Sequence, residues 1–182
     1  MSAPLTPAEP MRIFLLGMMG AGKTTVGREL ARRTGWPMLD NDDVVRGLTG
    51  REPRTIAVED GEDALHDVEA AAFREALDRP APLIVTIAGA MVERPEVRDR
   101  MPRAGHVVWL RARPETLLER IGPGADRRPE AVDPNWLAAR SAERDPLFQA
   151  VADQVIDVDD ADPEEVAATI LDALGGEERS AR

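Results

Sequence analysis

The sequence contains no cysteine and no tyrosine, and it has only 3 phenylalanines and 3 tryptophans. Without cysteine, disulfide bonds and thiolate metal sites are excluded, and the composition fits an intracellular protein. No apolar run is long enough to cross a membrane, and residues 1–10 lack the basic-then-apolar pattern of a signal peptide. We therefore expect a cytoplasmic protein without a membrane partner.

Positive charge is also scarce. The chain has 23 lysines and arginines against 34 aspartates and glutamates, which gives a net charge of −11. Binding to nucleic acid through a basic surface needs the opposite balance, so we expect no nucleic-acid partner. Lysine is the rarest of the charged residues, because it occurs only at position 23 and every other basic residue is an arginine. At 182 residues, the chain is expected to form a single domain.

The only lysine lies in a glycine-rich stretch, Gly17-Met18-Met19-Gly20-Ala21-Gly22-Lys23-Thr24-Thr25. It matches the phosphate-binding pattern G-x-x-x-x-G-K-[ST], between an expected strand and an expected helix. Backbone N–H groups there can converge on an anion, and the helix N-terminus adds partial positive charge. A turn without a ligand is the alternative, but a compact ammonium suits a phosphate site. The pattern predicts a nucleoside-triphosphate site, with Lys23 on the β- and γ-phosphates and Thr24 on Mg²⁺.

Strand-like and helix-like segments alternate along the chain. Strands are expected at residues 11–16, 36–40, 83–88, 106–110 and 155–158. Helices are expected at 25–33, 42–48, 61–77, 93–101, from 114 onward, 136–150 and 163–174. Asp145-Pro146 should interrupt the helix at 136–150, and Pro163 marks the first turn of the last one. This order predicts a three-layer α/β fold, with a five-stranded parallel sheet and helices on both faces. We expect residues 1–10 and 175–182 to be poorly ordered, and the glycine- and proline-rich segment 122–134 to be mobile.

Four polar residues, Asp40-Asn41-Asp42-Asp43, follow the second expected strand. They should lie at the same sheet edge as the glycine-rich stretch. Phosphoryl transfer to a hydroxyl needs a carboxylate that takes the proton, and a second carboxylate can hold magnesium. Polar residues at a strand end also form turns and helix caps, but the neighbouring phosphate site favours the functional interpretation.

The motifs of this chain resemble those of shikimate kinases, which transfer the γ-phosphoryl group of ATP to a hydroxyl of shikimate. The similarity extends from about residue 12 to residue 174. Besides the glycine-rich stretch, it rests on Asp40-Asn41-Asp42, Thr49-Gly50-Arg51, Glu59-Asp60-Gly61-Glu62, Arg128-Pro129 and Arg144-Asp145-Pro146-Leu147-Phe148. The resemblance implies one P-loop kinase domain over residues 1–182 that uses ATP and Mg²⁺, with residues 41–80 binding the acceptor.

The resemblance also implies a role for each matching residue on the ATP side. Arg120 takes the place of an arginine that stacks on adenine, and the segment around Pro163 lies beside the same base. Arg128 corresponds to the arginine of a lid over residues 122–134, which closes on the transferring phosphoryl group. Its neighbour Arg127 lies in the same segment.

On the acceptor side, the resemblance places Asp40 near magnesium and Asp42 on the acceptor hydroxyl, as its base. Glu69 matches an acid that follows the family's G-E motif. Arg144 takes the place of the arginine that grips the carboxylate of the acceptor.

The acceptor side also departs from the family pattern. The family reads G-E-x-x-F-R, whose arginine binds the acceptor carboxylate, whereas this chain has Leu65 and His66 there. The family's T-G-G-G is Ile87-Ala88-Gly89-Ala90 here, so that Gly89 alone is kept beside the acceptor. With His66 in an arginine's place, we predict an acceptor that lacks shikimate's carboxylate or presents it differently.

The leading hypothesis is a kinase of a small polyhydroxylated metabolite, acting as a monomer or weak dimer. The alternatives are an authentic shikimate kinase, a gluconate-kinase-like enzyme and a non-catalytic nucleotide-binding protein. Residues 144–148 favour the shikimate type over the gluconate type. Asp42 and Arg128 argue against a pure binding protein, which needs neither.

Overall fold

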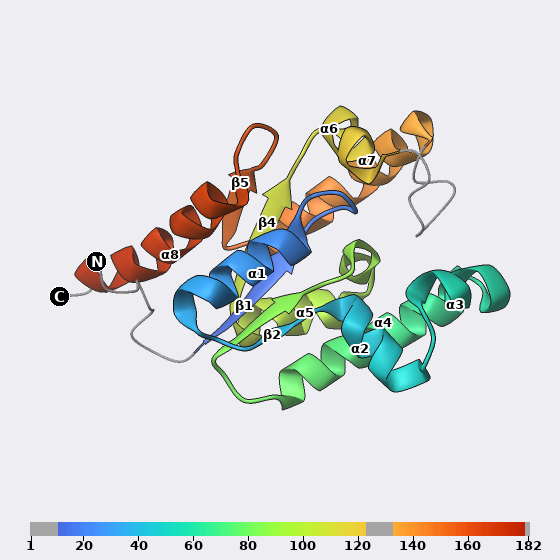
Figure 1. Ribbon diagram of the computed structural model, residues 1–182, viewed down its shortest axis with the longest axis horizontal. Coiled ribbons are helices and arrows are strands. Elements are labelled where there is room, and N and C mark those ends of the chain that lie inside the picture. Colours follow the sequence, from blue (N-terminus) through green and yellow to red (C-terminus); the bar gives the residue numbers. More distant parts are fainter. Residues whose placement is uncertain (1–10, 123–132, 181–182) are drawn as a thin grey trace.

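Five strands form one parallel sheet in the computed structural model, which describes residues 11–122 and 133–180, with side chains as far as residue 175. The strands are β1 (Arg12–Leu16), β2 (Met38–Leu39), β3 (Leu83–Thr86), β4 (His106–Arg111) and β5 (Gln154–Asp157). They pair in the order β2-β3-β1-β4-β5 (Figure 1). The predicted five-stranded parallel sheet is confirmed, and the C-terminal ends of all its strands meet at one edge.

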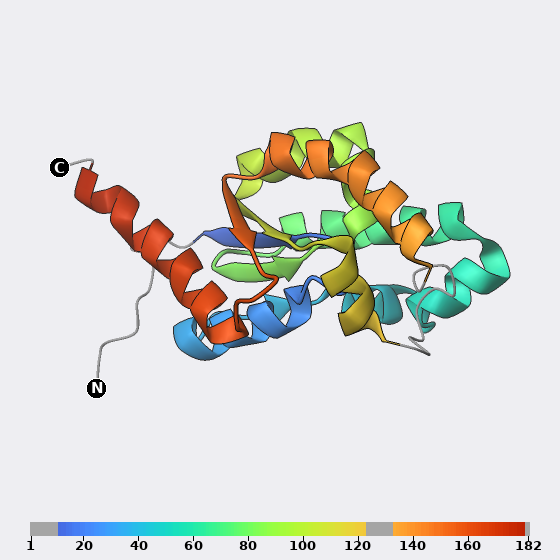
Figure 2. The same cartoon turned by 90° about the horizontal axis from the view of Figure 1, so that it is seen from above.

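Helices cover both faces of the sheet, as predicted. Figure 2 shows α1 (Lys23–Thr34) and α8 (Pro163–Ser180) on one face, with α5 (Pro95–Ala104) and α7 (Pro134–Val151) on the other. The other helical elements are α2 (Asn41–Thr49), α3 (Pro53–Asp60), α4 (Glu62–Asp78), the 3₁₀ helix η1 (Gly89–Glu93) and α6 (Pro114–Ile121). Helices α2, α3 and α4 pack against one another beside the sheet (Figure 1).

The central strand β1 is apolar at almost every position, and residues 13–16 are fully buried. In the sheet, Phe14 lies between Val85 of β3 and Val107 of β4. Its ring also contacts Phe73 of α4, with the ring centroids 6.1 Å apart. Burial of each such side chain stabilises the fold by about 1.5–3 kcal/mol. The loop that follows β1 therefore starts from a rigid support.

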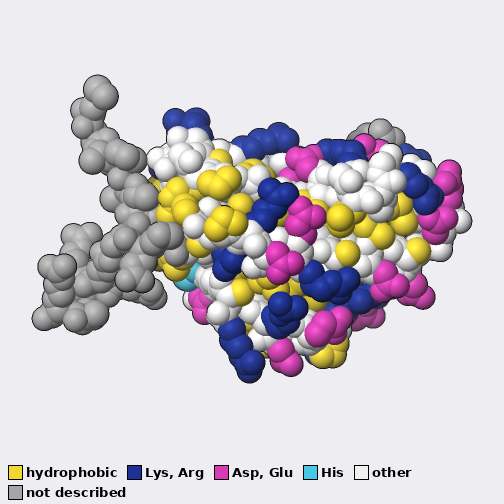
Figure 3. Space-filling view, turned by 90° about the horizontal axis from the view of Figure 1, so that it is seen from below, with side chains coloured by type: hydrophobic (Ala, Val, Ile, Leu, Met, Phe, Trp, Pro, Cys, Tyr) yellow, Lys and Arg dark blue, Asp and Glu magenta, His cyan; other side chains and the backbone are white. Residues whose placement is uncertain are grey.

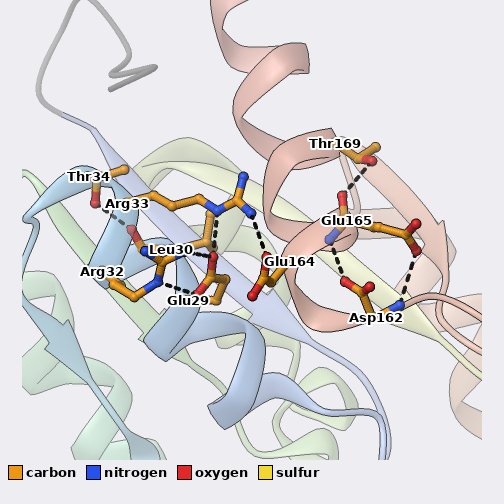
Figure 4. A network of polar contacts seen from close by, with 9 residues as sticks. All are labelled: Glu29, Leu30, Arg32, Arg33, Thr34, Asp162, Glu164, Glu165 and Thr169. Atoms are coloured by element: carbon orange, nitrogen blue, oxygen red, sulfur yellow. Dashed lines mark hydrogen bonds and ion pairs between the residues drawn. The ribbon is translucent and has the colours of Figure 1, made fainter. Parts of the chain in front are cut away.

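A network of polar contacts lies where α8 meets α1 (Figure 4). Glu29 accepts hydrogen bonds from arginines of its own helix, and Arg33 Nη2 lies 3.9 Å from Glu164 Oε2 of α8. At the start of α8, Glu165 N donates to Asp162 Oδ1 at 2.8 Å and Asp162 N donates to Glu165 Oε2 at 3.3 Å. This reciprocal capping box satisfies two backbone donors and fixes where α8 begins.

The pKa of Glu29 gives a test of the α1 network. Hydrogen bonds from Arg32 and Arg33 lower this pKa from 4.5 to about 2 in the folded protein. The folded state therefore binds the Glu29 proton more weakly than the unfolded state. The contribution of ionised Glu29 to the free energy of unfolding is present above pH 4.5 and is lost as the pH falls toward 2. Because Arg32 is largely exposed, we expect a loss of only about 0.5–1 kcal/mol.

The measurement is urea unfolding between pH 6 and pH 2.5 of the wild type and of Glu29→Gln. The variant should lose less stability over this range, and Glu119→Gln, at an exposed glutamate of α6, should behave like the wild type. Parallel curves for the wild type and Glu29→Gln would contradict the prediction.

One helix was not predicted from the sequence. The sequence pattern predicts no helix or strand over residues 53–60, but they form α3. Pro53 stands at the first helical position, where its fixed φ and missing N–H are well tolerated. Ile56 is buried beside α2 and α4. Only one of its eight residues is buried, so the helix lacks a long apolar stripe by which to recognise it.

Two helices are longer than the sequence predicts. We expected Asp145-Pro146 to interrupt α7, but the helix continues to Val151. Its buried positions recur every three or four residues, at Leu137, Ser141, Arg144, Phe148 and Val151. Packing of this stripe outweighs the hydrogen bond that Pro146 removes. Helix α8 continues to Ser180, beyond its expected end at residue 174, because glycines weaken a helix without breaking its hydrogen-bond ladder.

The face shown in Figure 3 carries basic and acidic side chains intermixed, with hydrophobic side chains between them. On this face the described side chains form no continuous basic area of the kind that binds nucleic acid. Among the described residues, no helix is both long and apolar enough to cross a bilayer.

Candidate active site

The glycine-rich stretch connects β1 to α1 and is shaped by the neighbouring backbone. Gly17 has a φ of +141°, and a Cβ there would lie 2.5 Å from the carbonyl oxygen of Leu110 in β4. At Gly20, with a φ of +84°, a Cβ would lie 2.9 Å from the carbonyl oxygen of Leu117. Only glycine fits both positions, which brings the loop close to β4 and α6.

Lys23 stands at the first position of α1, and its side chain folds back over the loop. Its Nζ donates to the carbonyl oxygens of Gly17 at 2.8 Å and Met18 at 3.0 Å. The loop's own carbonyl groups therefore hold the ammonium in place at the mouth of the phosphate site.

Asp40 connects the glycine-rich stretch to the acceptor side. Its Oδ2 accepts hydrogen bonds from Thr24 Oγ1 at 2.7 Å and from Thr86 Oγ1 at 3.3 Å. Its Oδ1 accepts from the backbone N–H of Asp42 at 3.0 Å and so caps α2. The sequence offered helix capping and a functional role as alternatives for residues 40–43, and Asp40 both caps α2 and contacts Thr24.

Two cavities meet at this point. One is lined by Gly20, Ala21, Gly22, Thr25, Arg120 and Pro163. The other lies toward α2, α3, α4 and α7. Met19, Lys23 and Thr24 line both cavities. We call the first the nucleotide cavity and the second the acceptor cavity.

Residues predicted on the ATP side gather around the nucleotide cavity. Arg120 donates from Nη2 to the carbonyl oxygens of Val158 and Asp159, the latter at 3.2 Å, and so ties α6 to the loop after β5. Pro163 begins α8 on the same cavity. The lid segment 122–134, with Arg127 and Arg128, falls mainly outside the described residues.

Residues predicted on the acceptor side line the acceptor cavity, with one exception. Asp42, Glu69, Gly89 and Arg144 all border it, and Asp40 does as well. His66 is not among its lining residues, and its Nε2 lies 3.6 Å from Glu62 Oε2 on the same helix. The structure therefore does not bring His66 into the cavity with the others.

Arg144 is oriented by a carboxylate that the sequence did not point to. Only 5% of Arg144 is exposed, and its Nε donates to Glu93 Oε1 at 2.7 Å. Its Nη1 lies 3.9 Å from the sulfur of Met18. A Cβ at Gly89 would lie 3.8 Å from this Nη1 and 3.1 Å from the carbonyl oxygen of Gly17. A side chain at Gly89 would therefore crowd the main chain of Gly17, while its contact with Arg144 would be an ordinary one.

Other residues of the site were also missed in the sequence. Thr86, the last residue of β3, accepts a hydrogen bond from the backbone N–H of Asn41 at 3.0 Å and donates to Asp40. In the sequence, the only sign of this role was that Thr86 is the one hydroxyl residue in an otherwise apolar strand. Arg54 and Trp136 also line the acceptor cavity, and no motif marked them.

The parallel strand order β2-β3-β1-β4-β5, with a phosphate-binding loop after the central strand, defines a P-loop kinase. The family model described as shikimate kinase matches residues 19–175. A shikimate kinase of Symbiobacterium thermophilum is 38% identical over 90% of this chain and 96% of its own length. The chain belongs to the shikimate kinase family, and it is an ATP-dependent phosphotransferase that acts on an alcohol.

Solved structures agree with this assignment. A shikimate kinase from Acinetobacter baumannii in complex with shikimate superposes with a TM-score of 0.86 at 29% identity, covering 94% of this chain and 96% of that one. A gluconokinase from Sinorhizobium meliloti 1021 has a TM-score of 0.60 at 19% identity, over 94% of this chain and 95% of that one. The second match shows a shared fold alone.

Thr86→Val tests the contact between β3 and α2. Valine keeps the shape of threonine but leaves the buried N–H of Asn41 without its acceptor, so the free energy of unfolding should fall by about 1–3 kcal/mol. Urea denaturation measures this loss. Thr169→Val is the matched control, because the Thr169 hydroxyl is exposed and bonds only within its own helix. Equal stabilities of the two variants would contradict a structural role for Thr86.

Proposed function

We propose that the protein transfers the γ-phosphoryl group of MgATP to a ring hydroxyl of shikimate or of a polyol acid of similar size. The observation that carries this proposal is the meeting of the two cavities at Lys23 and Thr24, with Asp42 and Arg144 on the acceptor side. A donor phosphate in one cavity and an acceptor hydroxyl in the other would come together beside these residues.

Asp42 is the proposed base. As the acceptor oxygen forms its bond to the γ-phosphorus, the bond to the β–γ bridging oxygen breaks and ADP leaves. The hydroxyl proton passes to the Asp42 carboxylate, which lies at the N-terminus of α2. Lys23 would offset negative charge on the β- and γ-phosphates, and the loop carbonyls that hold its ammonium pre-position it.

Thr24 and Asp40 fit a magnesium site. Both offer oxygen ligands of the type that Mg²⁺ prefers, and the two oxygens are 2.7 Å apart. A site with few protein ligands is typical where phosphate oxygens and water complete the coordination. The ion would neutralise charge on the phosphates when bound.

Arg144 indicates the acceptor class. A guanidinium that is nine-tenths buried favours a bidentate anion such as a carboxylate, because its N–H groups match two oxygens. This supports a polyol acid over a neutral polyol. The A. baumannii neighbour was solved with shikimate, which makes shikimate the first acceptor to test. Gluconate is the second, on the ground of the shared fold.

An acceptor screen tests this function. Purified protein with MgATP is offered shikimate, gluconate and a neutral cyclitol, and release of ADP is measured. A kcat/KM of about 10⁴ M⁻¹s⁻¹ or more on shikimate would identify an authentic shikimate kinase with an unusual acceptor cavity. Activity on another polyol acid, with little on shikimate, would support a related acceptor. Failure to release ADP with every acceptor would overturn the proposal.

Asp42→Asn tests the base. The amide cannot take a proton, so kcat should fall by about 10² or more while the KM for ATP changes by less than about twofold. Asp43→Asn is the control, because Asp43 follows directly, is exposed and pairs with Arg46 instead of lining the cavity. An equal fall of kcat in both variants, or a fall with Asp40→Asn alone, would contradict the assignment of Asp42.

A further inference from the structure

The acceptor cavity contains a second arginine that the family motifs do not mark. Arg54 is the second residue of α3, and it lines the cavity together with Arg144 of α7. His66, which takes the place of the family's carboxylate-binding arginine, does not line it. Arg54 is an exposed residue, and it therefore places a basic residue of α3 at the edge of the cavity, where the sequence suggested that one was missing from α4.

Arg54 stands at an unfavourable position for the helix dipole of α3. A helix N-terminus carries partial positive charge, so a cation in the first turn is unfavourable by about 0.3–1 kcal/mol. The first turn of α3 has no acidic residue, and the preceding N-cap residue, Glu52, pairs with Arg46. Residues that break a local rule are typical of functional sites, because the cost is offset by another role.

The charge balance of the cavity also calls for a second cation. The carboxylates of Asp42 and Glu69 line its acceptor side. Arg144 is already paired with Glu93 through its Nε, and its Nη1 contacts the sulfur of Met18. Lys23 and Asp40 also line the cavity and offset each other, so without Arg54 its lining would carry more negative than positive charge and would repel an anion.

We propose that Arg54 and Arg144 together bind the carboxylate of the acceptor, with Arg54 supplying from α3 the hydrogen bonds that His66 does not supply from α4. This inference rests on the proposed function, because it assumes an acidic acceptor. Two guanidinium groups on one carboxylate give several charge-assisted hydrogen bonds. The carboxylate would then approach from the α3 side of the cavity, which fits an acceptor that presents this group differently from the family's usual one.

Binding of shikimate and of its methyl ester, measured by calorimetry in the presence of ADP, tests the inference separately from turnover. The ester keeps the ring hydroxyls and lacks the charge. In the wild type, the acid should bind at least about tenfold more tightly than the ester. Arg54→Gln should weaken binding of the acid by about tenfold to a hundredfold and binding of the ester by less than about threefold.

Arg51→Gln is the matched control. Arg51 lies just before α3, pairs with Glu59 and Asp60, and does not line the cavity, so both ligands should bind it as they bind the wild type. Equal weakening of acid and ester in Arg54→Gln would show that Arg54 only shapes the cavity, and this would overturn the inference. So would unchanged binding of both ligands, or a wild type that does not prefer the acid.

The two proposals fail in different ways. A wild type that prefers the acid through Arg54, yet releases no ADP with any acceptor, would refute the proposed function and leave the arginine pair intact. A wild type that phosphorylates shikimate, with a KM that Arg54→Gln does not change, would refute the arginine pair and leave the function intact.

Discussion

The carboxylate of Asp40 joins the parts of the molecule on which the site depends. It accepts hydrogen bonds from Thr24 at the start of α1, from Thr86 at the end of β3 and from the first turn of α2. One side chain thus ties the phosphate-binding loop, the sheet and the acceptor-binding helices together. Because the site is assembled from these elements, the position of Asp42 relative to Lys23 follows from the geometry around Asp40.

Much of the fold and of the nucleotide side could be predicted because the signals are local. The glycine-rich stretch, the apolar strand before it and the helix after it are adjacent in sequence, and each limits the others. The buried strands read as continuous apolar runs, and proline at the first helical position marked α8. Such features depend on neighbouring residues, so a single sequence reveals them.

The acceptor side was predicted less completely because it is built by contacts between distant residues. Glu93 and Arg144 are 51 positions apart, and Thr86 and Asn41 are 45 apart. No periodicity or spacing joins such pairs. Helix α3 has a single buried residue and gave no amphipathic pattern, so Arg54 could not be placed beside the cavity. The resemblance showed that the family's carboxylate-binding arginine is absent at position 66. It did not indicate that Arg54 could take over this role.

The two cavities differ in whether the main chain or side chains determine their shape. The glycine-rich loop approaches the backbone of β4 and α6 so closely that an added methyl group at Gly17 or Gly20 would collide with a carbonyl oxygen. The acceptor cavity is bordered by side chains from separate helices, among them Arg54 and Arg144. Replacing one of these side chains leaves the main chain of the sheet in place. Single substitutions can therefore change which acceptor the enzyme phosphorylates. Its use of a nucleoside triphosphate is harder to change, because that site depends on the packing of the main chain.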